Sequence, residues 1–407
     1  MNVLGLSWRY LWSRPLATVL NLLLLALGLA SMAFVLIARD QIDRAFERDL
    51  AGIDAVVGAK GSPLQLILAG VFHLDVPPGN IPLTEVQRLA RHPQVAQVIP
   101  LSLGDNLRGF RIVGTTPDYA AHYRAQLAEG SVWSTSMQAV LGAQVASRTG
   151  LQTGQAFEGA HGLGAGGAAH GDRPYTVSGV LKPCGCVLDR LVLTATESVW
   201  QVHDDMHTSD PMDEAERLEL AEALADEREV TLALITYNTP MAAVSFPRFI
   251  NSTTSMQAAA PALEITRLLS MVGVGTRLLQ GLGTVLLGVA ALSVFIALWS
   301  AVRERRGDLA MLRMLGAPAG RVALLLLCEA LWLAALACVA GLLAAHGVAA
   351  LLGAMLMDSQ SLAISGWHWV PGEVWVPVLA LGVAVVAALV PVVSAARVDV
   401  SQLLNSR

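Results

Sequence analysis

Four long stretches of the sequence are almost free of charged side chains, and they constrain the fold more than any other feature. The stretches are Leu16–Ala38, Leu278–Val302, Val322–Met357 and Val374–Ala396. A helix of ~20 apolar residues is long enough to cross a lipid bilayer, so each stretch predicts a transmembrane helix. Charged residues make up only 14% of the chain, whereas a soluble protein typically contains about 25%. The composition therefore agrees with a membrane protein of four helices.

A cleavable signal peptide is the alternative interpretation of the first stretch. Such a peptide has an apolar region of about 7–15 residues that ends in a small-residue cleavage site. Leu16–Ala38 is longer than that, and it runs without such a site into the charged segment 39–50. We therefore interpret the stretch as a permanent anchor and expect its helix to continue into segment 39–50.

Cations gather beside the apolar stretches in a pattern that predicts orientation. They are Arg9, Arg14, Arg303, Arg305, Arg306, Arg313, Arg321, Arg397 and Arg407. The remaining short loop, near residues 358–373, has Asp358 and Glu373 but no lysine or arginine. Because arginine-rich short segments stay in the cytoplasm, both termini and the loop 303–321 are predicted to be cytoplasmic. The chain is therefore expected to cross a membrane several times.

The large segment between the first two apolar stretches is expected to form an extracytoplasmic α+β domain. Segment 39–277 has 26 acidic and 18 basic residues, which argues against nucleic acid and is compatible with cationic or metal-bearing partners. Short β-branched runs bounded by Gly, Pro or Asp predict strands within 110–116, 139–147, 175–181, 190–195 and 230–237. The predicted domains are 1–38 with the first helix, 39–275 outside, and 276–407 with the other three helices.

The loop sequence RERRGDLAMLRMLGA, residues 303–317, predicts a short amphipathic helix. On a helix, one broad side would present Leu309, Met311, Leu312, Met314 and Leu315, and the opposite side Arg306 and Arg313. Gly316 and Pro318 would end it. An interfacial helix with ordinary positive-inside arginines would need no particular sequence. The other interpretation is a docking helix, whose apolar side would fit a groove on a cytoplasmic partner and whose arginines would fix the register.

The segment ALWSAVRERRGDLAMLRMLGAPAGRV resembles the coupling segment of MacB/FtsX-type ABC transporter permeases, roughly S-V-x-E-R-x-x-E-I-x-x-L-R-A-L-G-A. The matching residues are Glu304, Arg305, Leu309, Leu312, Arg313, Leu315, Gly316 and Ala317, while Asp308 and Met314 replace Glu and Ala. Segments 7–28, 141–157, 175–183 and 391–404 are similar to the amino end, the external core domain and the carboxyl end of that family. These matches follow one another in the family's order.

The resemblance implies an FtsX-like membrane part with a MacB-like external domain, located in the inner membrane of a bacterium. It also implies a dimer of identical or different permeases, served by two cytoplasmic ATPase subunits. The ATPase-coupling residues would be Glu304, Arg305, Arg306, Asp308, Leu309, Leu312, Arg313, Leu315 and Gly316. The chain has no GxxxxGK[ST] phosphate-binding sequence, so ATP and Mg are expected in the partner and no cofactor in this chain. Without a GxSxG or HExxH motif, we expect no enzyme activity of its own.

Three functions follow from this resemblance as hypotheses. The first is mechanotransmission: ATP-driven motion reaches the external domain and exports or extracts a substrate on the outer side, with a periplasmic or outer-membrane partner. The second is a signal transducer that activates an external partner such as a cell-wall hydrolase. The third is a component of a metal-linked, zinc-handling ABC system. Membrane lipid is a partner in each case.

Glu329 and His346 are the two ionisable residues inside the third apolar stretch. A carboxylate in the membrane is costly and suggests a function by default. We expect Glu329 to lie near the inner interface and to pair with an arginine or a partner helix, in a structural or coupling role. Proton relay is the alternative. His346 is expected to be packed or hydrogen-bonded.

The cysteines and histidines of the external segment are the remaining candidates for chemistry. A disulfide between Cys184 and Cys186, two residues apart, would be strained and is not expected, because bridged Cα atoms and Cβ directions must meet a narrow geometry. The alternatives are small buried cysteines, a bond to a partner, or thiolate metal ligands. The candidate zinc ligands are His161, His170, His203 and His207, in no recognised metal-binding spacing. Cys328 and Cys338 are interpreted as packing residues of an apolar helix.

Overall fold

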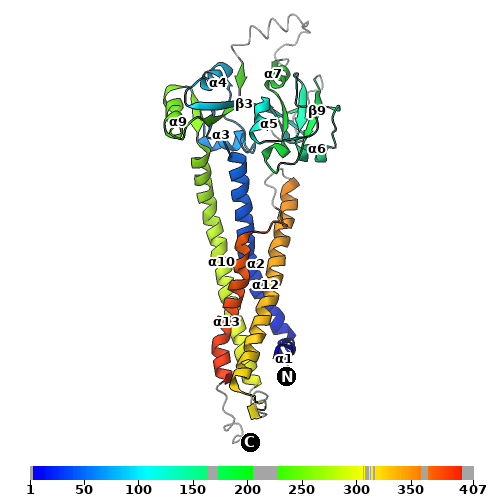
Figure 1. The fold of residues 1–407 in the computed structure, drawn as a ribbon, viewed down its shortest axis with the longest axis vertical. Helices are drawn as coiled ribbons and strands as arrows, with labels where there is room; N and C mark the ends of the chain where they lie inside the picture. Colours follow the sequence, from blue (N-terminus) through cyan, green and yellow to red (C-terminus); the bar gives the residue numbers. More distant parts are fainter. Residues whose placement is uncertain are drawn as a thin grey trace, which may run out of the picture. The chain divides into compact units, whose positions relative to one another are not determined.

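The computed structural model describes residues 3–162, 173–204, 228–305, 307, 311, 313–314, 317–358 and 365–396. The chain divides into two compact units (Figure 1). The helical unit comprises Met1–Asp43 and Met271–Arg407, and the sheet unit comprises Arg44–Ser270. Both divisions fall inside long helices, so the domain boundaries expected after residues 38 and 275 stay predictions.

Long helices build the helical unit. They are α1 (Val3–Leu11), α2 (Pro15–Leu50), α10 (Pro261–Glu304), α12 (Ala319–Asp358) and α13 (Trp375–Ala396), the last preceded by the 3-10 turn η3 (Pro371–Val374). By length and composition, α2, α10, α12 and the η3–α13 segment could each cross a membrane. The prediction of four transmembrane helices is confirmed, and α2 continues through the charged segment as expected.

Small residues allow α2 and α12 to pack closely. A Cβ atom added to Gly341 of α12 would lie 2.9 Å from the carbonyl oxygen of Ala26 and 3.1 Å from Cβ of Leu29. Only glycine leaves room for this approach of one helix backbone to the next, which is how membrane helices gain packing contacts that lipid cannot supply. At Gly341 the backbones of α2 and α12 therefore come into close contact.

Replacing Gly341 by valine is expected to lower the stability of the protein in detergent by about 1–3 kcal/mol, because the new side chain overpacks a closed contact. Thermal unfolding of the full chain measures the effect. Gly347→Val is the matched control on the same helix, since nothing lies within 4 Å of a Cβ added there. Equal melting temperatures for the two variants would show that the α2–α12 contact is not tight.

Thirteen strands and seven short helices build the described part of the sheet unit. The strands are β1 (Ala55–Ala59), β2 (Ile81–Pro82), β3 (Val95–Leu107), β4 (Phe110–Thr115), β5 (Leu127–Gly130), β6 (Gln138–Leu141), β7 (Ala156–Phe157), β8 (Ala160–His161), β9 (Tyr175–Leu181), β10 (Val192–Ala195), β11 (Glu229–Val230), β12 (Leu232–Tyr237) and β13 (Met256–Ala259). The helices are α3 (Pro63–Gly70), α4 (Leu83–Ala90), α5 (Pro117–His122), α6 (Ala143–Thr149), η1 (Val187–Arg190), α7 (Thr196–Asp204) and α9 (Ala242–Thr253).

Eleven of the strands form one mixed sheet in the order β13-β1-β12-β3-β4-β10-β6-β9-β5, with β7 added to β9 and β8 to β3. Strands β4 and β10, and β6 and β9, pair in parallel, and the other neighbours are antiparallel. Strands β2 and β11 form a small separate sheet. This confirms the expected α+β domain between the first and second membrane helices.

Alternating side chains give the sheet two apolar faces, and helices cover both. Val56 and Leu234 belong to one core cluster, whereas their neighbours Ala55 and Ile235 belong to another. Successive side chains of a strand point to opposite faces, so a strand buried on both sides must be apolar throughout. Strand β3 runs through the middle of this sheet (Figure 1).

Candidate functional site

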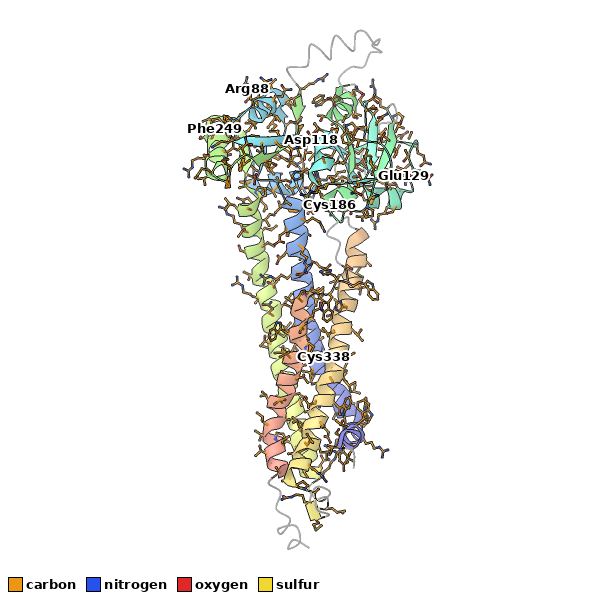
Figure 2. The ribbon with its side chains drawn as sticks, viewed as in Figure 1. Arg88, Asp118, Glu129, Cys186, Phe249 and Cys338 are labelled. Atoms are coloured by element: carbon orange, nitrogen blue, oxygen red, sulfur yellow. A yellow bond between two sulfur atoms is a disulfide. The ribbon has the colours of Figure 1, made fainter. Side chains whose placement is uncertain are left out.

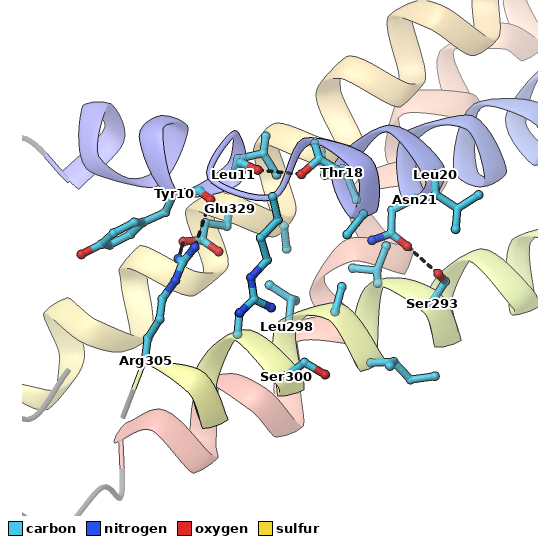
Figure 3. A pocket seen from close by; sticks show the side chains of 18 residues that line it. Tyr10, Leu11, Thr18, Leu20, Asn21, Ser293, Leu298, Ser300, Arg305 and Glu329 are labelled. Carbon is cyan, nitrogen blue, oxygen red and sulfur yellow. Dashed lines mark hydrogen bonds and ion pairs between the residues drawn. The ribbon is translucent and has the colours of Figure 1, made fainter. Parts of the chain in front are cut away.

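A cluster of charged side chains lies where α10 ends, and Arg305 is its centre. Its guanidinium donates from Nη1 to Oε1 of Glu329 at 3.4 Å and from Nη2 to the carbonyl oxygen of Tyr10 at 3.2 Å. It also donates to the hydroxyl of Ser13, and its Cζ lies 4.4 Å from the centre of the Tyr10 ring. Figure 3 shows Arg305 beside Tyr10 and Glu329. One side chain thus joins the end of α10, the end of α1 and the helix α12.

The turn between α1 and α2 is built so that it reaches this cluster. Pro15 begins α2, where its missing N–H costs no hydrogen bond. The hydroxyl of Thr18 donates to the carbonyl oxygen of Leu11 at 2.6 Å and closes the turn. Arg14 then forms an ion pair with Glu304, the last residue of α10. The positively charged turn therefore contacts the negatively charged last residue of α10 through this ion pair.

Burial makes the Arg305–Glu329 pair energetically different from the Arg14–Glu304 pair. The side chains of Arg305 and Glu329 are 15% and 6% exposed, whereas Glu304 is 62% exposed. Exposed ion pairs contribute about 0–1 kcal/mol. Removing one partner of a buried pair costs about 3–5 kcal/mol, because the other charge stays buried without compensation. The expected pairing of Glu329 with an arginine is present, while its coupling role stays a prediction.

A cavity of about 310 Å³ opens beside this cluster, between α1, α2, α10 and α12. Its charged lining consists of Arg14, Arg305 and Glu329. Asn21 and Ser293 supply neutral polar groups, with the Ser293 hydroxyl donating to Oδ1 of Asn21 (Figure 3). The site therefore combines a fixed polar cluster with an accessible space.

The coupling segment itself is described only in part. Gly307, Met311, Arg313 and Met314 have helical conformation, and the side chains of Met311 and Met314 are both 56% exposed. The predicted coupling residues Arg306, Asp308, Leu309, Leu312, Leu315 and Gly316 lie outside the described residues. The docking face therefore stays a prediction.

His346 is hydrogen-bonded through both ring nitrogens, in agreement with its interpretation as a packed residue. Its Nδ1 lies 2.7 Å from the carbonyl oxygen of Gly366, and its Nε2 lies 2.9 Å from Oε2 of Glu373. Oε1 of Glu373 accepts a hydrogen bond from the Val370 amide. Glu373, assigned from the sequence to the short loop near residues 358–373, is fully buried, and its pairing with His346 was not predicted.

Among the four candidate zinc ligands, His161 is the one whose side chain is described. Nδ1 of His161 lies 3.0 Å from Oδ1 of the buried Asp105. His203 belongs to α7, and its side chain is not among those described, while His170 and His207 lie outside the described residues. Within the described residues no group of three or more His, Cys, Asp or Glu side chains could hold a metal ion. The zinc hypothesis stays a prediction.

Cys184 and Cys186 form a disulfide with each other, so the expectation against this bond was wrong. Gly185 between them has φ +65°, a left-handed conformation that brings the two Cα atoms to 5.1 Å, within the range a disulfide requires. The pair is therefore neither bonded to a partner nor free as thiolate ligands. Figure 2 labels Cys186 in the sheet unit and Cys338 on α12, where Cys338 and Cys328 are free and buried.

Two carboxylates hold the backbone around this disulfide. The carboxylate of Asp189 accepts hydrogen bonds from the amides of Cys184 at 2.9 Å and Gly185 at 2.7 Å. Oδ1 of Asp49, near the end of α2, accepts one from the Val187 amide at 3.2 Å. The side chain of Arg190 is largely buried beside them, and this burial lowers its pKa. The loop of residues 184–190 is thus attached to the end of α2, and we call this attachment the joint. It was not foreseen from the sequence.

A buried histidine and tyrosine lie close to this joint. Nε2 of His73 lies 2.9 Å from the hydroxyl of Tyr119. Burial, reinforced by the positive charge of Arg111, holds the pKa of His73 well below its usual value, and burial also raises the pKa of Tyr119. Both shifts favour the neutral form of the side chain, as expected inside an apolar core.

Two family models match the chain. Residues 18–258 match the MacB-like periplasmic core domain, and residues 281–400 match the FtsX-like permease C-terminal. No curated protein matches.

Two solved structures are similar to the part of the chain that they cover. The periplasmic region of MacB from Actinobacillus actinomycetemcomitans has 10% sequence identity and a TM-score of 0.34, over 54% of this chain and 95% of that one. The extracellular domain of the ABC-type transporter YknZ from Gram-positive bacteria has 12% identity and a TM-score of 0.31, over 51% and 98%. Because the first family model covers more than half of the chain and the second covers most of its remainder, the chain belongs to the MacB/FtsX-type ABC transporter permeases.

Proposed function

We propose that the chain is the permease subunit that relays ATP-driven motion from a separate cytoplasmic ATPase to its external domain. The motion would export or extract a substrate on the outer side of the bacterial inner membrane. In this proposal both termini lie in the cytoplasm, ATP and Mg are bound by the ATPase, and a second permease completes a dimer. The arginine-rich flanks of the apolar stretches support this orientation.

The position of Arg305 is the observation that carries the proposal. It is the first residue after α10 and stands at the beginning of the coupling segment 303–317. Its contacts with Tyr10, Ser13 and Glu329 attach that beginning to α1, to the α1–α2 turn and to α12. A displacement of the coupling segment would therefore reach several helices at once and would not be absorbed in a flexible loop.

The exposed methionines support a docking role for the segment. Met311 and Met314 present flexible apolar side chains, which adapt well to a partner surface. They lie three residues apart, and side chains at that spacing share one side of a helix. Apolar side chains so exposed at the end of the bundle would be covered by a bound ATPase.

Substitutions in the coupling segment test the proposal. Leu312→Asp, Leu315→Asp and Arg313→Glu are each expected to abolish co-purification of the ATPase while the permease still inserts into the membrane. The ATPase is identified in the wild-type preparation by mass spectrometry through its GxxxxGK[ST] sequence. Arg321→Glu makes the same charge change as Arg313→Glu at an exposed position of α12 outside the segment, and should leave the complex intact. Unchanged co-purification in all three variants would contradict the proposal.

A further inference from the structure

The cavity beside Arg305 is apolar at its mouth and polar at its floor. Leu20 of α2 and Ile296 of α10 line it and are 56% and 54% exposed, so their side chains reach the surface of the bundle. Arg14 and Arg305 lie just outside the first and second apolar stretches, at the level expected for lipid headgroups. A ligand that enters here would have to be amphipathic.

The polar floor offers hydrogen-bond donors that are not used within the described part of the chain. Asn21 is 5% exposed, and its Oδ1 accepts from Ser293, but its amide nitrogen has no described partner. The hydroxyl of Ser300 also lines the cavity and has none among the described residues. Both residues line the cavity, so the Asn21 amide nitrogen and the Ser300 hydroxyl can each donate to a ligand there. This floor therefore fits a ligand that is rich in acceptor oxygens.

The charges of the lining favour an anion. Arg14 and Arg305 outnumber Glu329, the one carboxylate among the lining residues. Arg305 is committed to Glu329, Tyr10 and Ser13. Within the described residues, Arg14 forms its ion pair with Glu304, which does not line the cavity; the two side chains are 32% and 62% exposed. Such an exposed pair is weak, so Arg14 can turn its guanidinium to a ligand at little cost.

We propose that this cavity binds the phosphate group of an anionic phospholipid, with an acyl chain leaving between Leu20 and Ile296. Arg14 would hold the phosphate by charge-assisted hydrogen bonds, and Asn21 and Ser300 would donate to its other oxygens. Basic pockets between membrane helices recognise anionic headgroups by this chemistry. The inference does not depend on ATPase docking, since Arg14, Asn21 and Ser300 all lie outside the coupling segment 303–317.

Native mass spectrometry of the purified full chain, titrated in detergent with phosphatidylglycerol or phosphatidylcholine, tests the proposal. Wild type is expected to retain phosphatidylglycerol and to lose phosphatidylcholine. Arg14→Gln should weaken phosphatidylglycerol retention about tenfold, as expected for one lost charge-assisted hydrogen bond. Arg303→Gln is the matched control, because Arg303 is an arginine of the same region that does not line the cavity; it should retain the lipid like wild type.

A second variant and a competing ligand test the proposal further. Size-exclusion chromatography shows whether each variant is folded. If Arg14→Gln is not folded, Asn21→Leu replaces it as the test. Leucine has a similar volume to asparagine but no hydrogen-bond donor, so this variant should also weaken retention of phosphatidylglycerol. Inorganic phosphate, added as competitor, should displace the lipid only weakly, because it lacks the acyl chain. Equal retention of the two lipids, or equal loss in Arg14→Gln and Arg303→Gln, would overturn the proposal. Strong displacement by inorganic phosphate would overturn the lipid as its source.

Discussion

Replacing Arg305 by methionine is expected to destabilise the helical unit by about 3–5 kcal/mol, the usual cost of leaving one charge of a buried pair uncompensated. Methionine keeps much of the apolar stem of arginine but leaves Glu329 without its partner. The hydrogen bonds to Tyr10 and Ser13 would also be lost, so the end of α1 would detach. Thermal unfolding of the full chain in detergent measures the first effect, and hydrogen exchange of segment 3–14 measures the second.

Two further variants separate the pair from its surroundings. Arg303→Met removes an exposed arginine two residues away and should change stability by less than about 0.5 kcal/mol. The double variant Arg305→Met with Glu329→Leu should regain most of the loss, because an apolar pair can replace a buried ion pair. If Arg305→Met has the same melting temperature as wild type, the 3.4 Å ion pair between Arg305 and Glu329 does not stabilise the protein.

Replacing Asp189 by alanine is expected to destabilise the sheet unit by about 2–3 kcal/mol, less than two full charge-assisted hydrogen bonds because Gly185 is exposed. The amides of Cys184 and Gly185 would lose their acceptor. The neighbouring disulfide closes a loop of only three residues, and chain entropy assigns such a loop about 1.5 kcal/mol. The carboxylate therefore contributes more to this joint than the disulfide does.

Urea unfolding of the full chain, followed by tryptophan fluorescence, compares the two contributions. Asp118→Ala, in the first turn of α5, is the matched control, since its carboxylate is exposed and accepts no backbone amide in the described residues. The double variant Cys184→Ser with Cys186→Ser should lose less stability than Asp189→Ala. The reverse order would mean that the disulfide, and not the carboxylate, holds the loop.

The membrane helices could be predicted because their signal is local and long. A run as long as Leu16–Ala38 is explained best by a membrane-spanning helix. The charged continuation to Leu50 keeps a helical pattern that α2 follows. The short helix α1 was not foreseen. It packs against α12 through the edge-on contact of Trp8 with Trp332, with ring centres 5.3 Å apart, which no spacing within the amino-terminal segment reveals.

In the sheet unit, strands could be predicted and their neighbours could not. The run 230–237 contains β12, and 175–181 coincides with β9, because β-branched residues bounded by turn residues are a local signal. The run 139–147 proved to be strand β6 followed by helix α6, with the change at Gly142. The pairing of β12 with β3 joins residues more than a hundred positions apart, and no local pattern encodes that order.

In the candidate site, too, local features could be predicted and contacts between distant segments could not. Glu329 stood out because a carboxylate is rare in an apolar helix. That Arg305 rather than the nearer Arg321 is its partner follows from the packing of α10 on α12. The cavity depends on four helices meeting. The disulfide was misjudged because the left-handed φ of Gly185, which makes a bond over two residues feasible, is a property of the folded loop.

Strand β3 has a mechanical consequence for the whole sheet unit. Its first half, up to Leu101, pairs with β12, and its second half, from Leu101, pairs with β4 on the other side. The strands on the β12 side and those on the β4 side are therefore connected through the backbone of β3. The register with β4 shifts between Leu103 and Asp105, just beyond Leu101, the residue that pairs on both sides. There the Thr231 hydroxyl, 2.9 Å from the Leu103 amide, accepts the hydrogen bond that a paired strand would otherwise accept. A pull on the sheet would thus be carried along the β3 backbone, and because a register shift bends a strand locally, we expect the sheet to bend most between Leu101 and Asp105.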